Sequence, residues 1–376
     1  MSKIPKKEVK IQSDIWLGRI VYSGDNIGHE FSFKFKLGDK IFKLNRSLEY
    51  SEINIIYTKL FTNFYTEEQN IELVIEAEEN DDIPDTAKGS VFINVAKQTG
   101  IAGSIDLKIN EQGVNGIQKK QAILTFVFLE RTYSLGIKTL TDVDKHGWLV
   151  GYYVDPETLK EYGETVAFPF GLKVDLKRIE TKYTPKIGFT GEEFFEILEG
   201  HLTKDKKKCW ARLKLKRGGK SRFSEKTYDS SAKIKFTIEK RIANDNYFGK
   251  LKLYNSNNVV ITVDAITKIN NVTLPKGLYD LQIPDEPHKL GKLYEKYIPY
   301  SKTWFRIKNK ANPEIGYYLH YGQASAGCVT VREVKDSHGK FIDIWTPIYN
   351  YLILRRENNK IGIVGTIEII YKNKVK

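Results

Sequence analysis

Short segments in which apolar and polar residues alternate recur between about residues 10 and 130, and this pattern restricts what the chain can fold into. Alternation with a period of two matches a β-strand, whose successive side chains point to opposite faces. The clearest segments are residues 15–22, 29–35, 71–77, 89–95 and 121–128. They are rich in β-branched and aromatic residues, and turn-forming residues separate them. We therefore predict a β-sandwich-like domain over residues 1–130 and a mainly β fold for the chain.

The length of 376 residues is more than one ordinary hydrophobic core accommodates, so we expect a multidomain protein. A mixed, mostly β connecting domain is predicted over residues 131–235 and a β-rich domain over 236–376. Residues 190–200 begin with a threonine, end with a glycine and place apolar residues at helical spacing, which predicts one amphipathic helix. No apolar run reaches about 18 residues, so we predict no membrane span.

The segment 317–331 contains the main indication of chemistry in the chain, because it places His320 eight residues before Cys328 with small residues between them. A thiol is a weak nucleophile at its ordinary pKa of about 8.5, and a neighbouring base raises its thiolate fraction. We predict two short strands joined by a tight turn, which would bring the two side chains face to face. Backbone N–H groups around Ala326, Gly327 and Cys328 would then be free to stabilise an oxyanion.

The order of these residues resembles the catalytic domain of L,D-transpeptidases of the YkuD type. That family's signature is a His-Gly segment followed by Ser-His-Gly-Cys, a hydrophobic residue and Arg. His320 matches the first histidine, and the second part is matched by Ser325, Gly327, Cys328 and Val329. The short spacing is more similar to compact variants in interbacterial toxins that attack peptidoglycan, whose motif is Ser, any residue, Gly, Cys.

The segment also departs from the family pattern. Ala326 replaces the second histidine, Tyr321 separates His320 from Gly322, and Thr330 stands where arginine is usual. Arg332 or Arg306 would have to supply the missing arginine.

The resemblance extends over about residues 240–376. Its other parts are a hairpin at 249–265, a Pro-x-Gly-x-Tyr segment at 275–279, His288 after a proline, a strand at 304–307, a short helix at 344–353 and a closing strand at 365–371.

The resemblance implies a mechanism on the tetrapeptide stems of peptidoglycan. His320 would remove the proton of Cys328, and the thiolate would attack the carbonyl of the third stem residue, so that D-alanine leaves and a thioester remains. Water would then give L,D-carboxypeptidase activity, and an amine would give transpeptidation or exchange. The residues that would orient His320 or hold a substrate carboxylate are Ser325, Tyr318, His288, Arg306 and Arg332. No cofactor or metal is expected.

Other readings of the same residues stay open. Papain-like and NlpC-type peptidases place the cysteine before the histidine, and His338, the one histidine after Cys328, lies in a predicted hairpin tip. A sortase-like set would combine His288, Cys328 and Arg355, although the glycine before the cysteine is unlike sortases. In a purely structural reading, Cys328 is a small buried apolar residue and His320 its satisfied neighbour.

Net charge and local acidity suggest two further binding classes. The chain carries a net charge of +13, and cations alternate with aromatic and apolar residues over 204–222. Such a stretch can bind nucleic acids or other polyanions. No metal-nuclease motif accompanies this stretch, so we prefer a solvated basic face and do not expect nucleic acid as a partner. Residues 76–85 form an acidic stretch whose spacing fits no calcium loop, and we predict a solvated loop.

The amino terminus and the two cysteines bear on where the protein works. Residues 1–10 are positively charged without a following apolar segment, which predicts no secretory signal. Because peptidoglycan lies outside the cytoplasmic membrane, the alternatives are a trimmed leader, injection by a type VI-like secretion system, or release by a phage. We prefer an injected effector with secretion-apparatus proteins and a cognate immunity protein as partners, acting in the periplasm of a target cell. A non-catalytic wall-binding or structural component of a secretion particle is the other possibility.

Two cysteines, Cys209 and Cys328, imply no disulfide framework.

Overall fold

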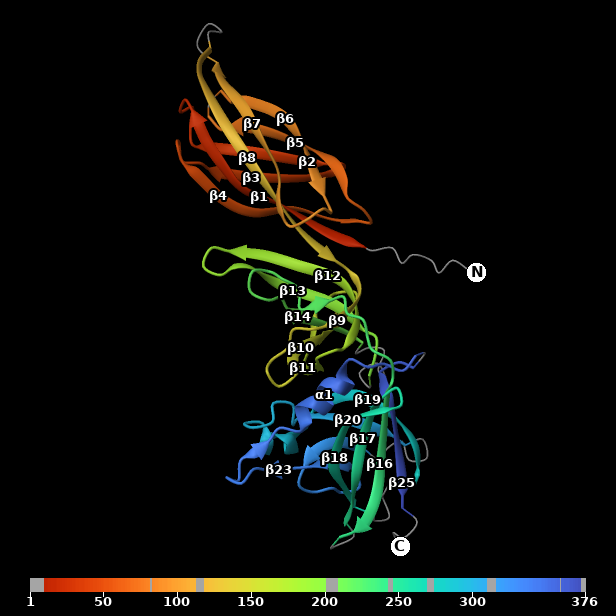
Figure 1. Ribbon diagram of the computed structural model, residues 1–376. Helices are drawn as coiled ribbons and strands as arrows, with labels where there is room; N and C mark the ends of the chain where they lie inside the picture. The colour runs from red at the N-terminus through yellow and green to blue at the C-terminus, as the bar shows by residue number, and fades with distance from the viewer. Residues whose placement is uncertain are drawn as a thin grey trace, which may run out of the picture. The chain divides into compact units, whose positions relative to one another are not determined.

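The computed structural model describes residues 10–81, 83–112, 118–200, 209–242, 246–268, 274–309, 316–358 and 360–372 (Figure 1). Strands dominate this part of the chain, which confirms the mainly β fold predicted from the sequence. The chain divides into two compact units. The first consists of residues 1–136, 178–191 and 217–219, and the second of residues 137–177, 192–216 and 220–376. Residues of the predicted connecting domain, 131–235, occur in both units.

The first unit contains two four-stranded antiparallel sheets that share one hydrophobic core. One sheet has the order β4-β1-β8-β7 and the other β3-β2-β5-β6. The strands are β1 (Ile11–Gly24), β2 (Glu30–Leu37), β3 (Lys40–Ser47), β4 (Ile53–Tyr65), β5 (Gln69–Glu79), β6 (Thr86–Val95), β7 (Gly100–Gln112) and β8 (Gln118–Ser134). Each of the five segments predicted from alternation lies in one of these strands or overlaps it. Residues 76–79 of the predicted acidic loop belong instead to β5, and Asp82 lies outside the described residues.

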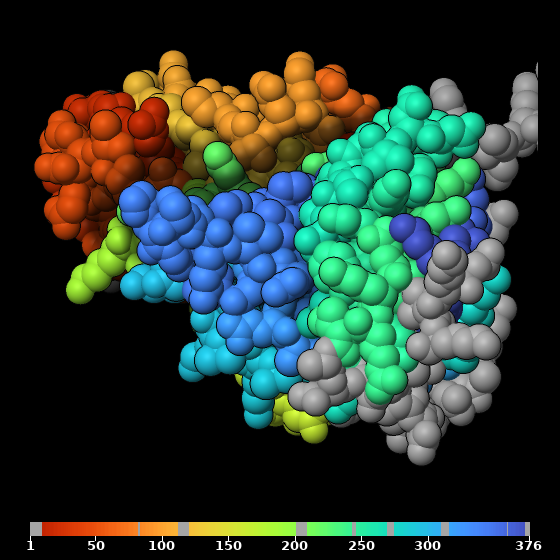
Figure 2. Space-filling model, turned by 60° about the horizontal axis from the view of Figure 1, so that its bottom comes forward, coloured from red at the N-terminus to blue at the C-terminus, as the bar shows by residue number. Residues whose placement is uncertain are grey.

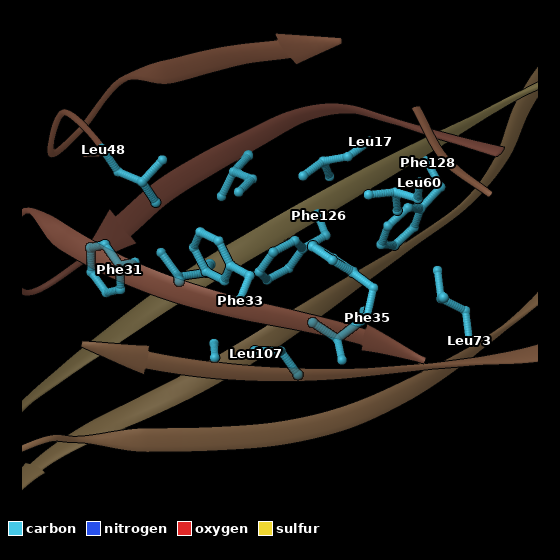
Figure 3. Packing of buried hydrophobic residues seen from close by; sticks show 14 of the residues in the cluster. Leu17, Phe31, Phe33, Phe35, Leu48, Leu60, Leu73, Leu107, Phe126 and Phe128 are labelled. Carbon is cyan, nitrogen blue, oxygen red and sulfur yellow. The ribbon is translucent and has the colours of Figure 1, made fainter. Parts of the chain in front are cut away.

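Aromatic residues at alternate positions fill this core. Phe31, Phe33 and Phe35 are buried on β2, whereas Ser32 and Lys34 between them are half-buried. Phe33 meets Phe126 of β8 edge to face, with ring centroids 5.4 Å apart, and the same cluster is seen from close by in Figure 3. Burial of such rings removes a large apolar area from water, so these positions dominate the stability of the unit.

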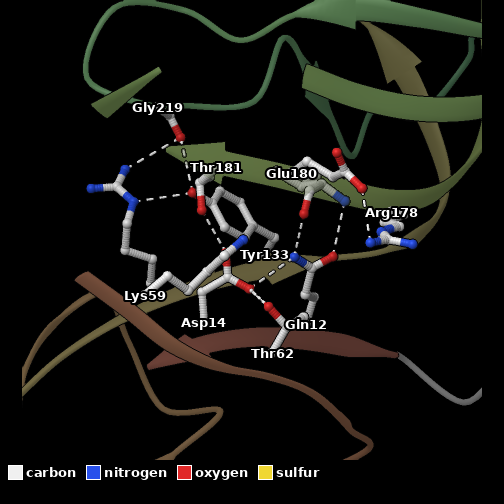
Figure 4. A network of polar contacts seen from close by, with 11 residues as sticks. Gln12, Asp14, Lys59, Thr62, Tyr133, Arg178, Glu180, Thr181 and Gly219 are labelled. Atoms are coloured by element: carbon white, nitrogen blue, oxygen red, sulfur yellow. Dashed lines mark hydrogen bonds and ion pairs between the residues drawn. The ribbon is translucent and has the colours of Figure 1, made fainter. Parts of the chain in front are cut away.

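A buried polar network connects β1 to residues 178–191 within the first unit (Figure 4). The carboxylate of Asp14 accepts hydrogen bonds from Thr62 Oγ1 at 2.8 Å and Thr181 Oγ1 at 2.6 Å. The amide of Gln12 bonds both backbone groups of Ile179, its Oε1 accepting from the N–H at 2.9 Å. Because Gln12 and Asp14 are fully buried, these partners replace the water that the two side chains lose on folding.

The helix predicted over residues 190–200 is wrong, because Gly188–Ile197 form strand β13. This strand pairs antiparallel with β14 (Trp210–Lys214), with Phe195 opposite Ala211. Successive residues Glu193, Phe194 and Phe195 are all buried, so both faces of the strand are covered. A strand buried on both faces lacks alternation, and its apolar spacing can then imitate the face of a helix.

The seven-stranded sheet that contains β13 has the order β11-β10-β14-β13-β12-β9-β15. Its other strands are β9 (Gly136–Leu140), β10 (Trp148–Val154), β11 (Glu161–Pro169), β12 (Lys173–Thr184) and β15 (Phe223–Ser224).

A closed barrel in the second unit carries the candidate site. Its strand order is β16-β17-β18-β22-β21-β20-β19-β25. The strands are β16 (Ala232–Arg241), β17 (Asn246–Asn255), β18 (Asn258–Lys268), β19 (Gly277–Pro287), β20 (Thr303–Lys308), β21 (Tyr317–Gly322), β22 (Val329–Arg332) and β25 (Ile363–Tyr371). Figure 2 shows β16 to β18 as a continuous green surface with the blue C-terminal segment beside it, in agreement with the pairing of β18 with β22.

Several local predictions for the C-terminal region are confirmed. The hairpin at 249–265 is formed by β17 and β18, and the closing strand at 365–371 lies in β25. The predicted short helix is α1 (Trp345–Ile353). A 3-10 helix, η3 (Lys289–Tyr294), follows β19, and β23 (Val334–Lys335) and β24 (Phe341–Ile342) form a small hairpin with His338 in its tip. Among the described residues, no helix is long and apolar enough to cross a membrane.

Candidate functional site

The two strands around the predicted cysteine–histidine pair are parallel, so the expected tight-turn hairpin is wrong. β21 and β22 pair with Leu319 opposite Val329 and His320 opposite Thr330. The direction of β22 follows from its place in the barrel, where it also pairs antiparallel with β18. Residues 323–328 make this connection, although parallel neighbours usually need a dozen residues or more. Gly327 has a φ of 111°, which a residue with a side chain rarely adopts.

His320 is buried, and both of its ring nitrogens have partners. Nδ1 lies 3.0 Å from the carbonyl oxygen of Tyr321 and Nε2 lies 3.0 Å from Thr330 Oγ1. Since a carbonyl oxygen only accepts, Nδ1 carries the proton, and in the neutral ring Nε2 accepts from the Thr330 hydroxyl. Burial lowers the pKa of His320 to about 4. The imidazole is therefore neutral near pH 7.

Cys328 stands directly before β22 and is half-buried with a free thiol. Burial raises the pKa of this thiol, and a hydrogen bond from the backbone N–H of Tyr318 opposes that effect in part. Between these two described side chains, no hydrogen bond joins Cys328 to His320. The thiol is therefore protonated near neutral pH, and the imidazole that would activate it has other partners.

The loop before Cys328 is held by its own hydrogen bonds. Ser325 Oγ donates to the carbonyl oxygen of Cys328 at 2.6 Å and accepts from the N–H of Gly327 at 3.3 Å. The Gly327 amide, which we expected to be free for an oxyanion, is thus occupied in this conformation. Ala326 is exposed beside it.

A second polar group consists of Asp285 on β19, His288 directly after β19, and Tyr318 on β21. His288 Nε2 lies 3.0 Å from Asp285 Oδ1, and the Tyr318 hydroxyl donates to Asp285 Oδ2 at 2.9 Å. Burial, and then the charge of Asp285, raise the pKa of Tyr318. Arg306 is directly opposite Tyr318 in the β20–β21 pairing, and its charge acts on the same hydroxyl in the opposite direction. Arg332, by contrast, is exposed at the end of β22.

Trp304 brings the two histidines into one aromatic stack. Its indole ring lies 4.2 Å from the His288 ring and 4.0 Å from the His320 ring, with interplanar angles of 9° and 17°. The candidate residues His288, His320 and Tyr318 are therefore brought together, whereas Cys328 meets this group through the backbone of Tyr318. Sequence reasoning did not assign a role to Trp304, Asp285 or Thr330. The spacing of Asp285 and His288, three residues apart, was the one available signal.

Carboxylates neutralise part of the described basic stretch. Arg212 forms ion pairs with Glu161 and Glu192. Arg222 and Lys216 both pair with Asp142, the lysine at 3.2 Å. Residues 204–208 lie outside the described residues. The side chains that the sequence offered for binding polyanions are thus partly engaged within the protein.

Two further candidates from the sequence have different surroundings. Arg355, part of the sortase-like alternative, lies over the ring of Tyr351 and pairs with Asp229 at 3.6 Å. Within the described ranges, no group of three His, Cys, Asp or Glu side chains is arranged to hold a metal ion.

Comparison with known proteins adds no assignment. No family model matches the chain, and no curated protein matches it.

Proposed function

We propose that the C-terminal barrel is a cysteine acyl-transfer enzyme that acts on the stem peptides of peptidoglycan. The observation that supports this proposal most directly is the parallel pairing of β21 with β22, which places the strand after Cys328 beside the strand of His320. Cys328 is half-buried and forms no disulfide. The resemblance of residues 325–329 to the compact L,D-transpeptidase motif supplies the substrate class.

The proposal requires His320 to exchange one hydrogen bond when substrate enters. Thr330 Oγ1 lies 3.3 Å from the carbonyl oxygen of Ala324, so the hydroxyl has a second acceptor within reach. Turning the Thr330 hydroxyl toward Ala324 frees the lone pair on His320 Nε2. Catalytic hydrogen bonds are often incomplete without substrate and form only in the complex. The described conformation is, in this proposal, a resting state.

In the proposed reaction, His320 Nε2 takes the proton from Cys328 Sγ, and the thiolate attacks the carbonyl carbon of the third stem residue. The bond to the terminal D-alanine breaks, and its amine takes the proton from the imidazolium. The thioester is then cleaved by water or by an amine. In this proposal Tyr318, Arg306 and His288 bind a substrate carboxylate or orient His320. Delivery into a target cell by a contact-dependent apparatus is proposed on the resemblance to the compact toxin variants alone.

Mass spectrometry of muropeptides incubated with the protein tests this proposal. We expect release of D-alanine from tetrapeptide stems by the unchanged protein and by Cys209→Ala, which removes the other cysteine. Cys328→Ala and His320→Gln should each abolish it. Turnover that persists in Cys328→Ala, or none by the unchanged protein, would refute the enzyme assignment.

A non-catalytic wall-binding role is the second candidate, and the raised pKa of the Cys328 thiol favours it. Alkylation by iodoacetamide near pH 7 separates the two. An enzyme thiol that His320 can activate should react faster than Cys209, and slower after His320→Gln. Equal slow labelling of both cysteines, together with binding to purified sacculi, would support the non-catalytic role.

A further inference from the structure

The sheet β3-β2-β5-β6 of the first unit has a hollow on the face that points away from the hydrophobic core. Its volume is about 660 Å³, within the range of small-molecule sites. Polar side chains dominate its lining, among them Ser32, Lys34, Lys43, Asn45, Glu76 and Lys88. Phe33 and Ala77, which lie between them on the same strands, form part of the floor of the hollow and belong to the core cluster.

Four charged side chains cross this hollow in one row. Lys43 is opposite Lys34, Lys34 is opposite Glu76, and Glu76 is opposite Lys88. Both oxygens of Glu76 are used, one by Lys34 at 2.8 Å and one by Lys88 at 2.9 Å. These hydrogen bonds lower the pKa of Glu76 to about 2, so the carboxylate stays charged. The row therefore contains three cations and one carboxylate, which pairs with two of them.

Lys43 is the lysine of this row whose charge no carboxylate of the described residues neutralises. It is exposed, and the described residues give it no ion pair. Like charges directly opposite each other on neighbouring strands destabilise a sheet, so the Lys43–Lys34 pair costs stability without a ligand. An anion placed between these two ammonium groups would remove the repulsion.

The next row of the sheet has a different character. Asn45, Ser32, Glu78 and Thr86 are opposite one another in the same order of strands. Ser32 Oγ donates to Asn80 Oδ1 at 3.0 Å and can still accept from a ligand hydroxyl, whereas the Asn45 amide and the Thr86 hydroxyl can donate and accept. The carboxylate of Glu78 makes this row unsuitable for a second anionic group. The hollow thus combines one anion-binding row with one row suited to neutral hydroxyls.

We propose that this hollow binds an acidic saccharide, with its anionic group at Lys43 and Lys34 and its sugar hydroxyls along the Asn45–Ser32–Thr86 row. A linear polyanion such as a nucleic acid fits less well, because Glu78 would repel a charge placed in the row next to the lysines. The site lies in the first unit and does not depend on the cysteine chemistry proposed for the second.

Isothermal titration calorimetry on the full chain tests this inference. The probes are trigalacturonate, which carries carboxylates, a phosphorylated maltotriose and neutral maltotriose. We expect at least one acidic probe to bind and neutral maltotriose to bind at least about tenfold more weakly, a difference of about 1.4 kcal/mol. Whichever acidic probe binds identifies the anionic group. Failure of both acidic probes to bind, or equal binding of neutral maltotriose, would overturn the proposal.

Two lysine variants separate the site from general surface charge. Lys43→Gln should weaken binding of the acidic probe about tenfold or more. Lys36→Gln is the matched control, since Lys36 is exposed on the same strand two residues from Lys34 and does not line the hollow. An equal loss of affinity in both variants would overturn the proposed site. Both side chains are exposed, so neither substitution disturbs the core.

Discussion

The imidazole ring of His320 lies almost flat on the indole ring of Trp304, with ring centroids 4.0 Å apart and planes inclined by 17°. His288 covers the other face of the same indole. The indole therefore separates a buried imidazole from a half-buried one that is paired with Asp285. The electrostatic effect of His288 also lowers the pKa of His320. Changes at His288 should for this reason be measurable at His320.

Burial of His320 should make the second unit less stable in mild acid. Its pKa falls from 6.5 to about 4 in the folded protein, so the unfolded chain binds this proton more readily. The stability that neutral His320 provides is fully present above pH 6.5 and is lost as pH falls toward 4. We expect a loss of about 2 kcal/mol between pH 7 and pH 5 from this residue.

Urea unfolding at the two pH values checks this prediction. His320→Gln should be less stable than the unchanged protein at pH 7 but should lack this share of the pH dependence. His338→Gln is the control, since His338 is exposed in a hairpin tip and its replacement should leave the slope unchanged. The same pH dependence in His320→Gln as in the unchanged protein would contradict the prediction.

Replacing His288 should raise the pKa of His320. His288→Gln removes an imidazole whose electrostatic effect disfavours the protonated form of His320. The value should stay below 6.5, because burial is the larger cause and is retained. NMR titration of the ring signals measures the shift directly. His146→Gln is the comparison, since His146 bonds Pro299 and Glu295 instead, and an equal shift in both variants would count against the stack.

Local patterns of sequence predicted those elements whose periodicity or turn residues are visible within a short segment. Alternation at Phe31, Phe33 and Phe35 identified a half-buried strand, because the two faces of β2 meet different environments. The turn at Ser256, with a φ of 56°, joins two paired strands just as the Asn and Ser residues there indicated. In both cases the residues that carry the pattern lie within a few positions of each other along the chain, even where, as for Phe33 and Phe126, the contacts that they make are distant.

Elements decided by distant partners were not predictable in the same way. β13 is a strand because β12 and β14 cover its edges and both of its faces are buried, which its own apolar spacing does not reveal. The small residues before Cys328 suggested a tight turn, but the direction of β22 depends on β18, some sixty residues earlier. The stack of Trp304 between His288 and His320 likewise joins three different strands or their ends. Residue types and spacing therefore identified His288, His320 and Cys328 as candidates but did not predict how these side chains are arranged in space.

The contribution of Glu193 to stability should depend on pH in the direction opposite to that of His320. It is fully buried, and burial raises its pKa from 4.5 to about 7 despite hydrogen bonds from Ser221 Oγ and the N–H of Arg222. A raised folded-state pKa means that its contribution is present below pH 4.5 and is lost as pH rises through 7. As pH rises from 5 to 8, the free energy of unfolding of Glu193→Gln should therefore increase by about 2.5 kcal/mol relative to that of the unchanged protein.

Unfolding of both proteins by urea at several pH values provides the measurement. Glu225→Gln is a suitable comparison, because Glu225 is exposed and its pKa is lowered rather than raised. If the stability difference between Glu193→Gln and the unchanged protein stays constant from pH 5 to pH 8, the carboxyl group is not protonated in the folded state and the prediction is wrong.

Replacing only one partner of the Arg356–Glu199 ion pair should destabilise the protein strongly. Arg356 donates from Nε and Nη2 to the two carboxylate oxygens of Glu199 at 3.0 and 2.7 Å, and both side chains are largely buried. Nη2 also donates to the carbonyl oxygen of Gly171. Arg356→Met leaves a buried carboxylate without its cation, which typically costs about 3–5 kcal/mol.

A double-mutant cycle shows whether this cost comes from the unpaired charge. Replacing both residues, Arg356→Met with Glu199→Met, removes the stranded charge, so the double variant should be more stable than the sum of the single losses predicts. We expect a coupling energy of about 1–3 kcal/mol from urea unfolding. If Arg356→Met strands a buried carboxylate, adding Glu199→Met should cost much less than Glu199→Met costs alone. Additive losses would instead mean that the two side chains stabilise the protein independently, and would contradict the prediction.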